Sequence, residues 1–114
     1  MNNYNLKERT KKFGIEIVIF SQEVTKNVTT LPLINQLVRS ATSIGANYFE
    51  ADNAESKNDF KHKIGISQKE SDETVYWLEL LEVACPKFKE KIIKLRQEAK
   101  ELNLIFNAIK KKCI

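Results

Sequence analysis

The chain has 114 residues, of which 42% are apolar and 30% charged, and its formal net charge is +4. This length suits one globular domain that buries a core without disulfides or metal ions, and no uncharged apolar stretch reaches the roughly 18 residues that a membrane span needs. These features exclude a membrane-spanning protein, and because residues 1–10 are polar, without the apolar run of a secretory signal, we expect a cytoplasmic location.

Apolar residues recur with helical spacing from residue 6 onward. Asn5 and Glu8 have the spacing of a capping box, which predicts where a first helix begins. The β-branched and polar residues before Pro32 end the pattern, so we predict a helix over residues 6–28. One face of this helix, at alternating steps of four and three residues, consists of Leu6, Thr10, Phe13, Ile17, Phe20 and Val24.

A second helix is predicted over residues 32–54. Pro32 fits its first turn, because proline lacks the amide proton that a first turn leaves unpaired in any case. The apolar face of this helix consists of Leu33 or Ile34, then Leu37, Ala41, Ile44, Tyr48 and Ala51.

Two further helices follow, over residues 57–84 and 86–112. Ser56 and Asp59 form a second capping-box pair, and Cys85-Pro86 marks the break between the two helices. The face of the third helix is rich in hydroxyl groups and consists of Phe60, Ile64, Ser67, Ser71, Thr74, Leu78 and Leu81. The fourth has the most regular repeat, with Phe88, Ile92, Leu95, Ala99, Leu102, Phe106 and Ile109.

Four helical segments of similar length, joined by short turns, predict an antiparallel up-down-up-down four-helix bundle of the all-α class, with residues 1–114 as one domain. Cys85 and Cys113 would then bracket one helix, about 42 Å apart at about 1.5 Å per residue, which is too far for a disulfide. Both cysteines are therefore predicted to be reduced thiols.

Several apolar residues lie outside these faces. Ile15, Val18 and Ile19 make the first helix apolar nearly all the way round, although a helix in a monomeric bundle needs a single apolar stripe. We interpret the surplus as a candidate interface of a homo-oligomer, and a core wider than an ideal heptad seam is the alternative. The third helix contributes further members of this candidate interface: Tyr76, Trp77 and Leu80.

The sequence contains no recognisable catalytic or metal-binding motif. Its single histidine, His62, lies between Lys61 and Lys63 and is expected at the solvated surface. Asp59 and His62 have the spacing of a carboxylate-bridged di-iron bundle, but that site needs a second such motif and the chain has no second histidine. No HExxH motif, phosphate-binding glycine loop or Cys-x-x-Cys pair occurs. We therefore expect no enzyme activity, no metal and no cofactor.

A polar stripe runs beside the apolar face of the second predicted helix, and the third offers polar side chains at matching heights. Because partly buried polar groups need partners, we predict a hydrogen-bonded network that sets the register of these two helices. A ligand-binding role is the alternative. The candidate members are Arg39, Ser43, Asn47, Glu50, Ser67, Glu70 and Thr74.

Positive charge is concentrated in the first and last segments. Residues 85–114 contain nine Lys or Arg against three Glu, whereas residues 29–84 are net negative. The first and last helices are neighbours in an up-down bundle, so their cations form a strip to which an RNA or DNA backbone can bind without sequence preference. The alternative is that they only keep the protein dissolved. The candidate residues are Lys7, Arg9, Lys11, Lys12, Lys87, Lys89, Lys91, Lys94, Arg96, Lys110, Lys111 and Lys112.

Two blocks of the sequence resemble a known family. Residues 36–50, QLVRSATSIGANYFE, match the approximate pattern R-x-x-x-S-I-x-x-N-x-x-E-G, with Ala51 in place of the final glycine. Phe60-Lys61-His62-Lys63-Ile64 and the segment from Glu70 to Leu81, with the form E-x-x-E-T-x-Y-W-L-x-L-L, match the second block. Together with the heptads of the fourth helix, the likeness covers nearly the whole chain. The chain thus resembles the four-helix-bundle proteins encoded inside intervening sequences of bacterial large-subunit ribosomal RNA genes.

The resemblance implies an up-down bundle that assembles as a ring-like homopentamer, and it implies no catalytic residues. It also extends to the accessory protein of diversity-generating retroelements, a basic bundle that contacts nucleic acid and reverse transcriptase. We therefore expect a non-enzymatic homo-oligomer that binds RNA or DNA through the first and last helices. A purely structural or protein-interaction module is the alternative.

Overall fold

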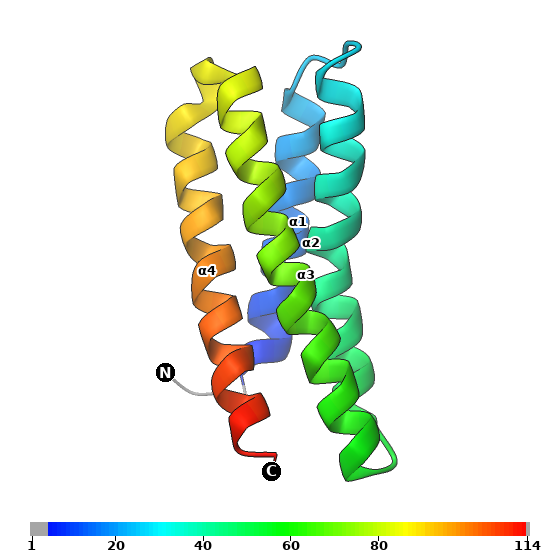
Figure 1. Cartoon of the computed structure of the whole chain (residues 1–114). Coiled ribbons are helices and arrows are strands. Elements are labelled where there is room, and N and C mark those ends of the chain that lie inside the picture. The colour runs from blue at the N-terminus through cyan, green and yellow to red at the C-terminus, as the bar shows by residue number, and fades with distance from the viewer. Residues whose placement is uncertain (1–4, 114) are drawn as a thin grey trace.

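The computed structural model describes residues 5–113, and within them every regular element is helical. The long helices are α1 (Leu6–Glu23), α2 (Thr30–Asp52), α3 (Lys57–Ala84) and α4 (Lys89–Lys111), with a short 3-10 turn, η2 (Pro86–Phe88), before α4. Figure 1 shows that successive helices run in opposite directions along one bundle. The predicted all-α, up-down-up-down four-helix bundle is confirmed.

The core forms along one face of each helix. Every residue predicted for the apolar face of α1 is buried, and so are Ile34, Leu37, Ala41, Ile44 and Ala51 of α2. The middle of the α3 face buries hydroxyl groups, because Ser67, Ser71 and Thr74 are fully covered. The heptad repeat therefore places the core correctly. At its edges Tyr48, Phe60, Phe88 and Ile109 are only partly buried.

The first predicted turn is wrong by several residues. α1 ends at Glu23, five residues before the predicted end, and Val24 is already extended, with φ −81° and ψ 129°. The Asn27 side chain explains the early end: its Oδ1 accepts hydrogen bonds from the Thr29 and Thr30 amides, each at 2.9 Å. Thr30 Oγ1 also donates to the Thr25 carbonyl oxygen at 2.7 Å. Side chains thus satisfy the backbone here in place of a helical turn.

The other helix ends differ by smaller amounts. α2 begins at Thr30, so Pro32 is its third residue and not its first, and it ends at Asp52. Asn5 precedes α1 but makes no side-chain capping bond, contrary to the first predicted capping box. Ser56 does cap α3, because its hydroxyl accepts a hydrogen bond from the Asp59 amide at 3.0 Å.

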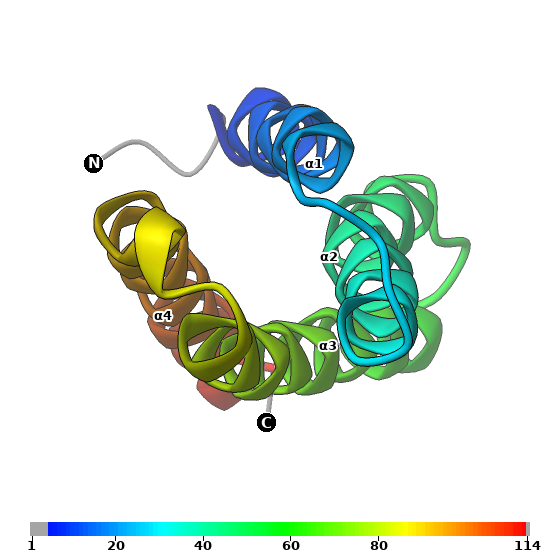
Figure 2. The ribbon, with the colours of Figure 1, turned by 90° about the horizontal axis from the view of Figure 1, so that it is seen from above.

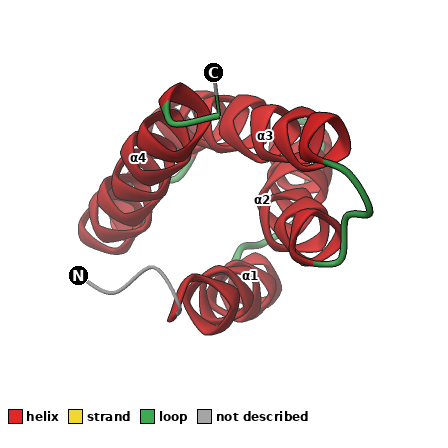
Figure 3. Ribbon diagram, turned by 90° about the horizontal axis from the view of Figure 1, so that it is seen from below, coloured by secondary structure: helices red, strands yellow, loops and turns green. Residues whose placement is uncertain are grey.

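The four helices do not pack equally tightly. α3 packs extensively against both α2 and α4, whereas α1 packs on α2 and contacts α4 least. Figures 2 and 3, seen along the bundle axis from its two ends, show α1 and α4 as the most separated neighbours. α1 is therefore the least enclosed helix. Within the described residues, none of these helices has the length and apolar character needed to cross a membrane.

Candidate interaction surfaces

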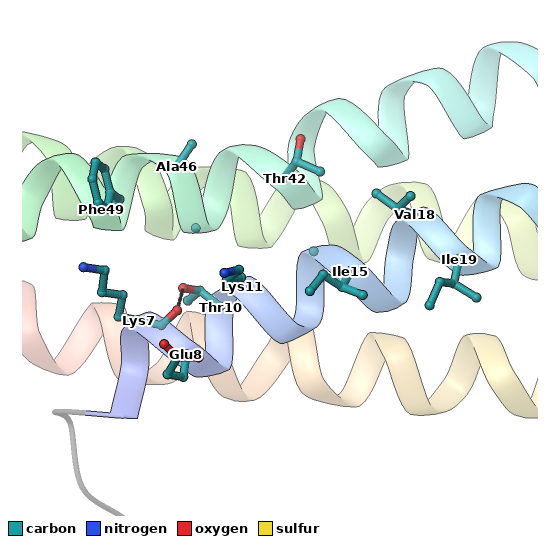
Figure 4. Close-up of a pocket in the computed structure, with 12 residues that line it drawn as sticks. Lys7, Glu8, Thr10, Lys11, Ile15, Val18, Ile19, Thr42, Ala46 and Phe49 are labelled. Carbon is teal, nitrogen blue, oxygen red and sulfur yellow. Dashed lines mark hydrogen bonds between the residues drawn. The ribbon is translucent and has the colours of Figure 1, made fainter.

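A groove of about 540 Å³ runs between α1 and α2. Small residues create it: Gly14 has open space where a side chain would be, and a methyl group added to Gly45 would lie 3.4 Å from Thr10. Figure 4 shows Ile15, Val18 and Ile19 following one another along α1, opposite the α2 residues that complete the groove. Those α2 residues are Thr42, Gly45, Ala46 and Phe49.

The apolar surplus of α1 stays exposed in the isolated chain. The exposed fractions of Ile15, Val18 and Ile19 are 51%, 39% and 50%. A wider core therefore does not account for these residues, because no other helix covers them. Phe49 of α2, which is 52% exposed, extends the same apolar surface.

The α3 members of the candidate interface lie on a different surface. Tyr76 is 52% exposed, whereas Trp77 and Leu80 are partly buried, and Trp77 packs against the core. The Trp77 and Tyr76 rings meet edge to face with centroids 5.0 Å apart. Because α1 and α3 are not adjacent in the bundle, the six candidates form two separate apolar surfaces.

Polar side chains link α2 to α3. The Arg39 guanidinium lies 3.3 Å from the Glu70 carboxylate and also pairs with Glu73, which in turn accepts a hydrogen bond from Trp77 Nε1 at 3.2 Å. Charge-assisted pairs of this kind hold two helices at one relative height. Glu73 was not among the predicted members, although it stands one turn after Glu70.

Buried hydroxyl groups form a second part of the α2–α3 contact. Ser67 Oγ donates to the Ile44 carbonyl oxygen at 3.0 Å. Thr74 Oγ1 lies 2.9 Å from Ser40 Oγ, and all three hydroxyl-bearing residues are fully buried. Ser40 was missed because it lies one residue after Arg39, outside the polar stripe that continues from Arg39 at steps of four.

The remaining predicted members do not join α2 to α3 in the expected way. Ser43 and Asn47 donate to carbonyl oxygens of α2 itself, at 2.7 and 2.9 Å. Glu50 does reach α3, but its partner is Lys63, at 2.6 Å. Among the described residues no buried side-chain nitrogen or oxygen lacks a hydrogen-bond partner.

Ion pairs occupy part of the predicted basic strip. Arg9 of α1 donates two bonds of 2.7 Å to the Glu98 carboxylate of α4, and a third, of 2.8 Å, to Glu101. These hydrogen bonds, above all those to Glu98, raise the pKa of Arg9 above its usual value. The ion pairs of Arg9 with Glu98 and Glu101 thus link α1 to α4, the two neighbouring helices that pack least against each other.

Two further cations of the strip have carboxylate partners. Lys91 lies 2.5 Å from Glu23, and Arg96 lies 2.5 Å from Glu82. Two others lie over aromatic rings: Lys7 is 5.0 Å from the Phe49 centroid, and Lys87 is next to Phe88. The rest are exposed, and no carboxylate in the described part of the chain pairs with them: Lys11, Lys12, Lys89, Lys94, Lys110, Lys111 and Lys112.

A hollow of about 690 Å³ between α1 and α4 is lined by charges of both signs. Lys12 and Lys94 line it together with the ion-paired Arg9 and Lys91, and Glu16 and Glu98 line it too. Four cations therefore face two carboxylates, so the predicted basic strip has a positive but partly neutralised surface.

A third groove, of about 500 Å³, lies between the first turns of α3 and the end of α4. The charged residues that line it are Lys61, Lys69 and Lys110, and His62 lies beside them. The strip predicted from the sequence includes Lys110 but not the two α3 lysines, because residues 57–84 carry a net negative charge. The recurrence of Lys61, Gly65 and Lys69 at steps of four was the available signal.

No site for metal or covalent chemistry stands out. Within residues 5–113 no three His, Cys, Asp or Glu side chains are grouped as metal ligands. Cys85 and Cys113 are free thiols, and burial raises the pKa of the Cys85 thiol. His62 lines the α3–α4 groove together with Lys61, Lys69 and Lys110.

Comparisons with known proteins place these surfaces in a family context. A family model described as "23S rRNA-intervening sequence protein" matches residues 2–108. A solved structure of a protein of unknown function from the S23 ribosomal protein family of Bacteroides thetaiotaomicron is 35% identical, with a TM-score of 0.82; the alignment covers 92% of this chain and 97% of that one. A search of curated proteins finds no significant match.

Proposed function

Because the chain belongs to the 23S rRNA-intervening sequence protein family, we propose that it is a non-enzymatic, homo-oligomeric helical bundle that binds the backbone of RNA or DNA. The observation that carries the nucleic-acid part is the set of exposed lysines on α1 and α4 that have no carboxylate partner among the described residues. Unpaired lysines are free to displace the counterions of a phosphate backbone, which is the main source of sequence-independent affinity. We place this protein in the cytoplasm.

Self-association rests on the two exposed apolar surfaces. The first surface is the α1–α2 groove with Ile15 and Ile19 of α1, and the second is the α3 surface with Tyr76. The two surfaces are separate because α1 and α3 are not adjacent in the bundle. Two different surfaces that pair between copies give a head-to-tail contact, and such contacts form a ring when the rotation between neighbouring copies closes on itself. The family resemblance favours five subunits. Burying these side chains against a second copy would remove them from water without any change of fold.

Titration of labelled RNA and DNA duplexes at several salt concentrations tests the nucleic-acid part. We expect fluorescence anisotropy to rise on binding, and log K to fall linearly with log salt concentration. The variant Lys12→Gln/Lys94→Gln should lower the slope by about 1.8, since each phosphate contact contributes about 0.9. Lys26→Gln/Lys63→Gln removes the same charge elsewhere, from the α1–α2 loop and from a lysine paired with Glu50, and should leave the slope nearly unchanged.

One observation favours the competing function, a structural or protein-interaction module. Arg9, Lys91 and Arg96, three of the predicted contact residues, already have carboxylate partners within the subunit. If the protein is such a module, the remaining lysines only keep the oligomer soluble. Absence of binding to either duplex at low salt, by a protein with normal helix content, would establish this alternative.

A further inference from the structure

We propose that the α3–α4 groove is a binding site for the phosphodiester backbone of one nucleic-acid strand. This inference rests on the proposed function and locates its main contact away from the α1–α4 strip. Asn58, Lys61, His62, Gly65, Ile66 and Lys69 of α3 and Lys110 of α4 line the groove.

The residues that line the α3–α4 groove give it a positive charge. Three lysines line the groove and no carboxylate does, whereas two glutamates line the larger α1–α4 hollow. No ion pair to Lys61, Lys69 or Lys110 is present within residues 5–113, although other lysines of this chain do pair with glutamates. Like charges gathered in one concave surface repel one another, and that repulsion is relieved when a polyanion occupies the groove.

The spacing of the lysines selects a chain of phosphates over a single one. Lys61 and Lys69 are eight residues apart on one helix, which separates their Cα atoms by about 12 Å at about 1.5 Å per residue. Phosphates of one duplex strand follow one another about every 3.4 Å along the axis, so the row is as long as three to four such steps. A strand can place a separate phosphate beside each lysine, whereas a single phosphate ion carries too little charge to neutralise all three.

The fourth helix supplies the central cation. Gly65 lies halfway between Lys61 and Lys69 in the sequence. A Cβ atom added to Gly65 would lie 3.6 Å from the Nζ atom of Lys110. The ammonium group of Lys110 thus lies over the open backbone of α3 and completes a row drawn from two helices. The row exists only when α3 and α4 are packed together, since residues 61 and 110 are far apart in sequence.

The other lining side chains suit a nucleic-acid strand. Asn58 and His62 offer hydrogen-bond donors to phosphate or sugar oxygens, and Ile66 offers an apolar contact to a sugar or base. An acidic protein segment would meet the same lysines, but it has no sugar or base for Asn58, His62 and Ile66 to contact. The chemistry therefore favours a phosphodiester strand over a peptide.

A charge-matched pair of variants tests the proposal. Lys61→Gln/Lys69→Gln/Lys110→Gln removes the row, and Lys12→Gln/Lys89→Gln/Lys94→Gln removes the same charge from α1 and α4. With a labelled single-stranded oligonucleotide, the first variant should lower the salt slope by about 2, since each phosphate contact to a single strand contributes about 0.7. The second variant should lower it by less. Equal salt slopes for the two variants, or a lower slope for the second, would refute the groove as the binding site without contradicting the proposed function.

His62 provides a readout that does not depend on mutation. It is the only histidine of the chain, so its ring gives a single, assignable pair of NMR signals. We expect these signals to shift when RNA or DNA oligonucleotide is added to the unmodified protein. Unshifted signals under conditions where the oligonucleotide is bound would overturn the site, and so would equal shifts with polyglutamate at the same concentration. If the wild-type protein binds no oligonucleotide at low salt, both the proposed function and this site fail.

Discussion

Replacing the exposed isoleucines of α1 should separate the subunits of the proposed oligomer without unfolding them. Ile15 and Ile19 are 51% and 50% exposed, so each leaves about half of its side chain to be buried by a partner. Full burial of an isoleucine stabilises by roughly 1.5–3 kcal/mol, and half of that is about 1 kcal/mol per residue. The variant Ile15→Gln/Ile19→Gln should therefore weaken each subunit contact by about 2 kcal/mol, or about 30-fold.

Glutamine is chosen so that the subunit itself stays intact. Its methylene groups cover the apolar surface that the inner half of each isoleucine covers now, and its helix propensity is slightly better than that of isoleucine. The thermal unfolding of the separated subunit should then change little. Val28→Gln is the matched control, because Val28 is 93% exposed and lies in the α1–α2 loop outside the groove.

Light scattering behind size exclusion, over a dilution series, measures the effect. We expect a multimeric mass for the wild type and the control, and dissociation of the double variant at concentrations where the control is still assembled. A wild type that is monomeric at every concentration would refute the argument from exposed apolar surface. A double variant that keeps the wild-type mass throughout would refute the role of the α1–α2 groove.

Three further predictions concern the packing of the subunit. Trp77→Ala should lower the free energy of unfolding by about 2 kcal/mol, which is half of the usual core value because Trp77 is only partly buried. Trp77→Phe should lower it much less. Equal losses for the two variants in urea unfolding would contradict this packing role. Ser67→Ala should destabilise by about 1 kcal/mol, since it removes a buried hydrogen bond between α3 and α2, and an unchanged unfolding midpoint would show that the bond contributes nothing. Cys113 should react quickly with a thiol reagent and Cys85 slowly, because Cys85 is 8% exposed and burial raises its pKa. The raised pKa disfavours the thiolate in the folded state, so this contribution to stability is present at neutral pH and is lost as pH rises through the alkaline range; Cys85→Ser should flatten that part of a pH–stability profile.

The periodic apolar pattern determined the helices and their inward faces. Phe13, Ile17 and Phe20 are buried because steps of three and four return to one side of a helix, whatever the partner is. The same counting showed that Ile15 and Ile19 have no place in that stripe, and both are exposed. Which residues share a face depends on each helix alone, so the sequence was sufficient to predict the inward faces.

The end of α1 depended on atoms that a pattern does not specify. The β-branched residues before Pro32 fit the spacing of a helical repeat. However, the side chains of Asn27 and Thr30 form hydrogen bonds with the backbone of the α1–α2 loop, and these bonds compete with the backbone hydrogen bonds of a longer helix. The outcome is a balance between two sets of similar bonds. Residue types alone did not show which set would form.

The charged surfaces were decided by tertiary structure alone. Counting lysines and arginines marked α1 and α4 as basic, but only the packed bundle brings Glu98 against Arg9, 89 residues away, and so neutralises part of the strip. Packing also brings Lys110 over Gly65 and makes a row of lysines from a segment whose net charge is negative. Coulomb interactions fall with distance through space, and the distance along the chain does not determine them.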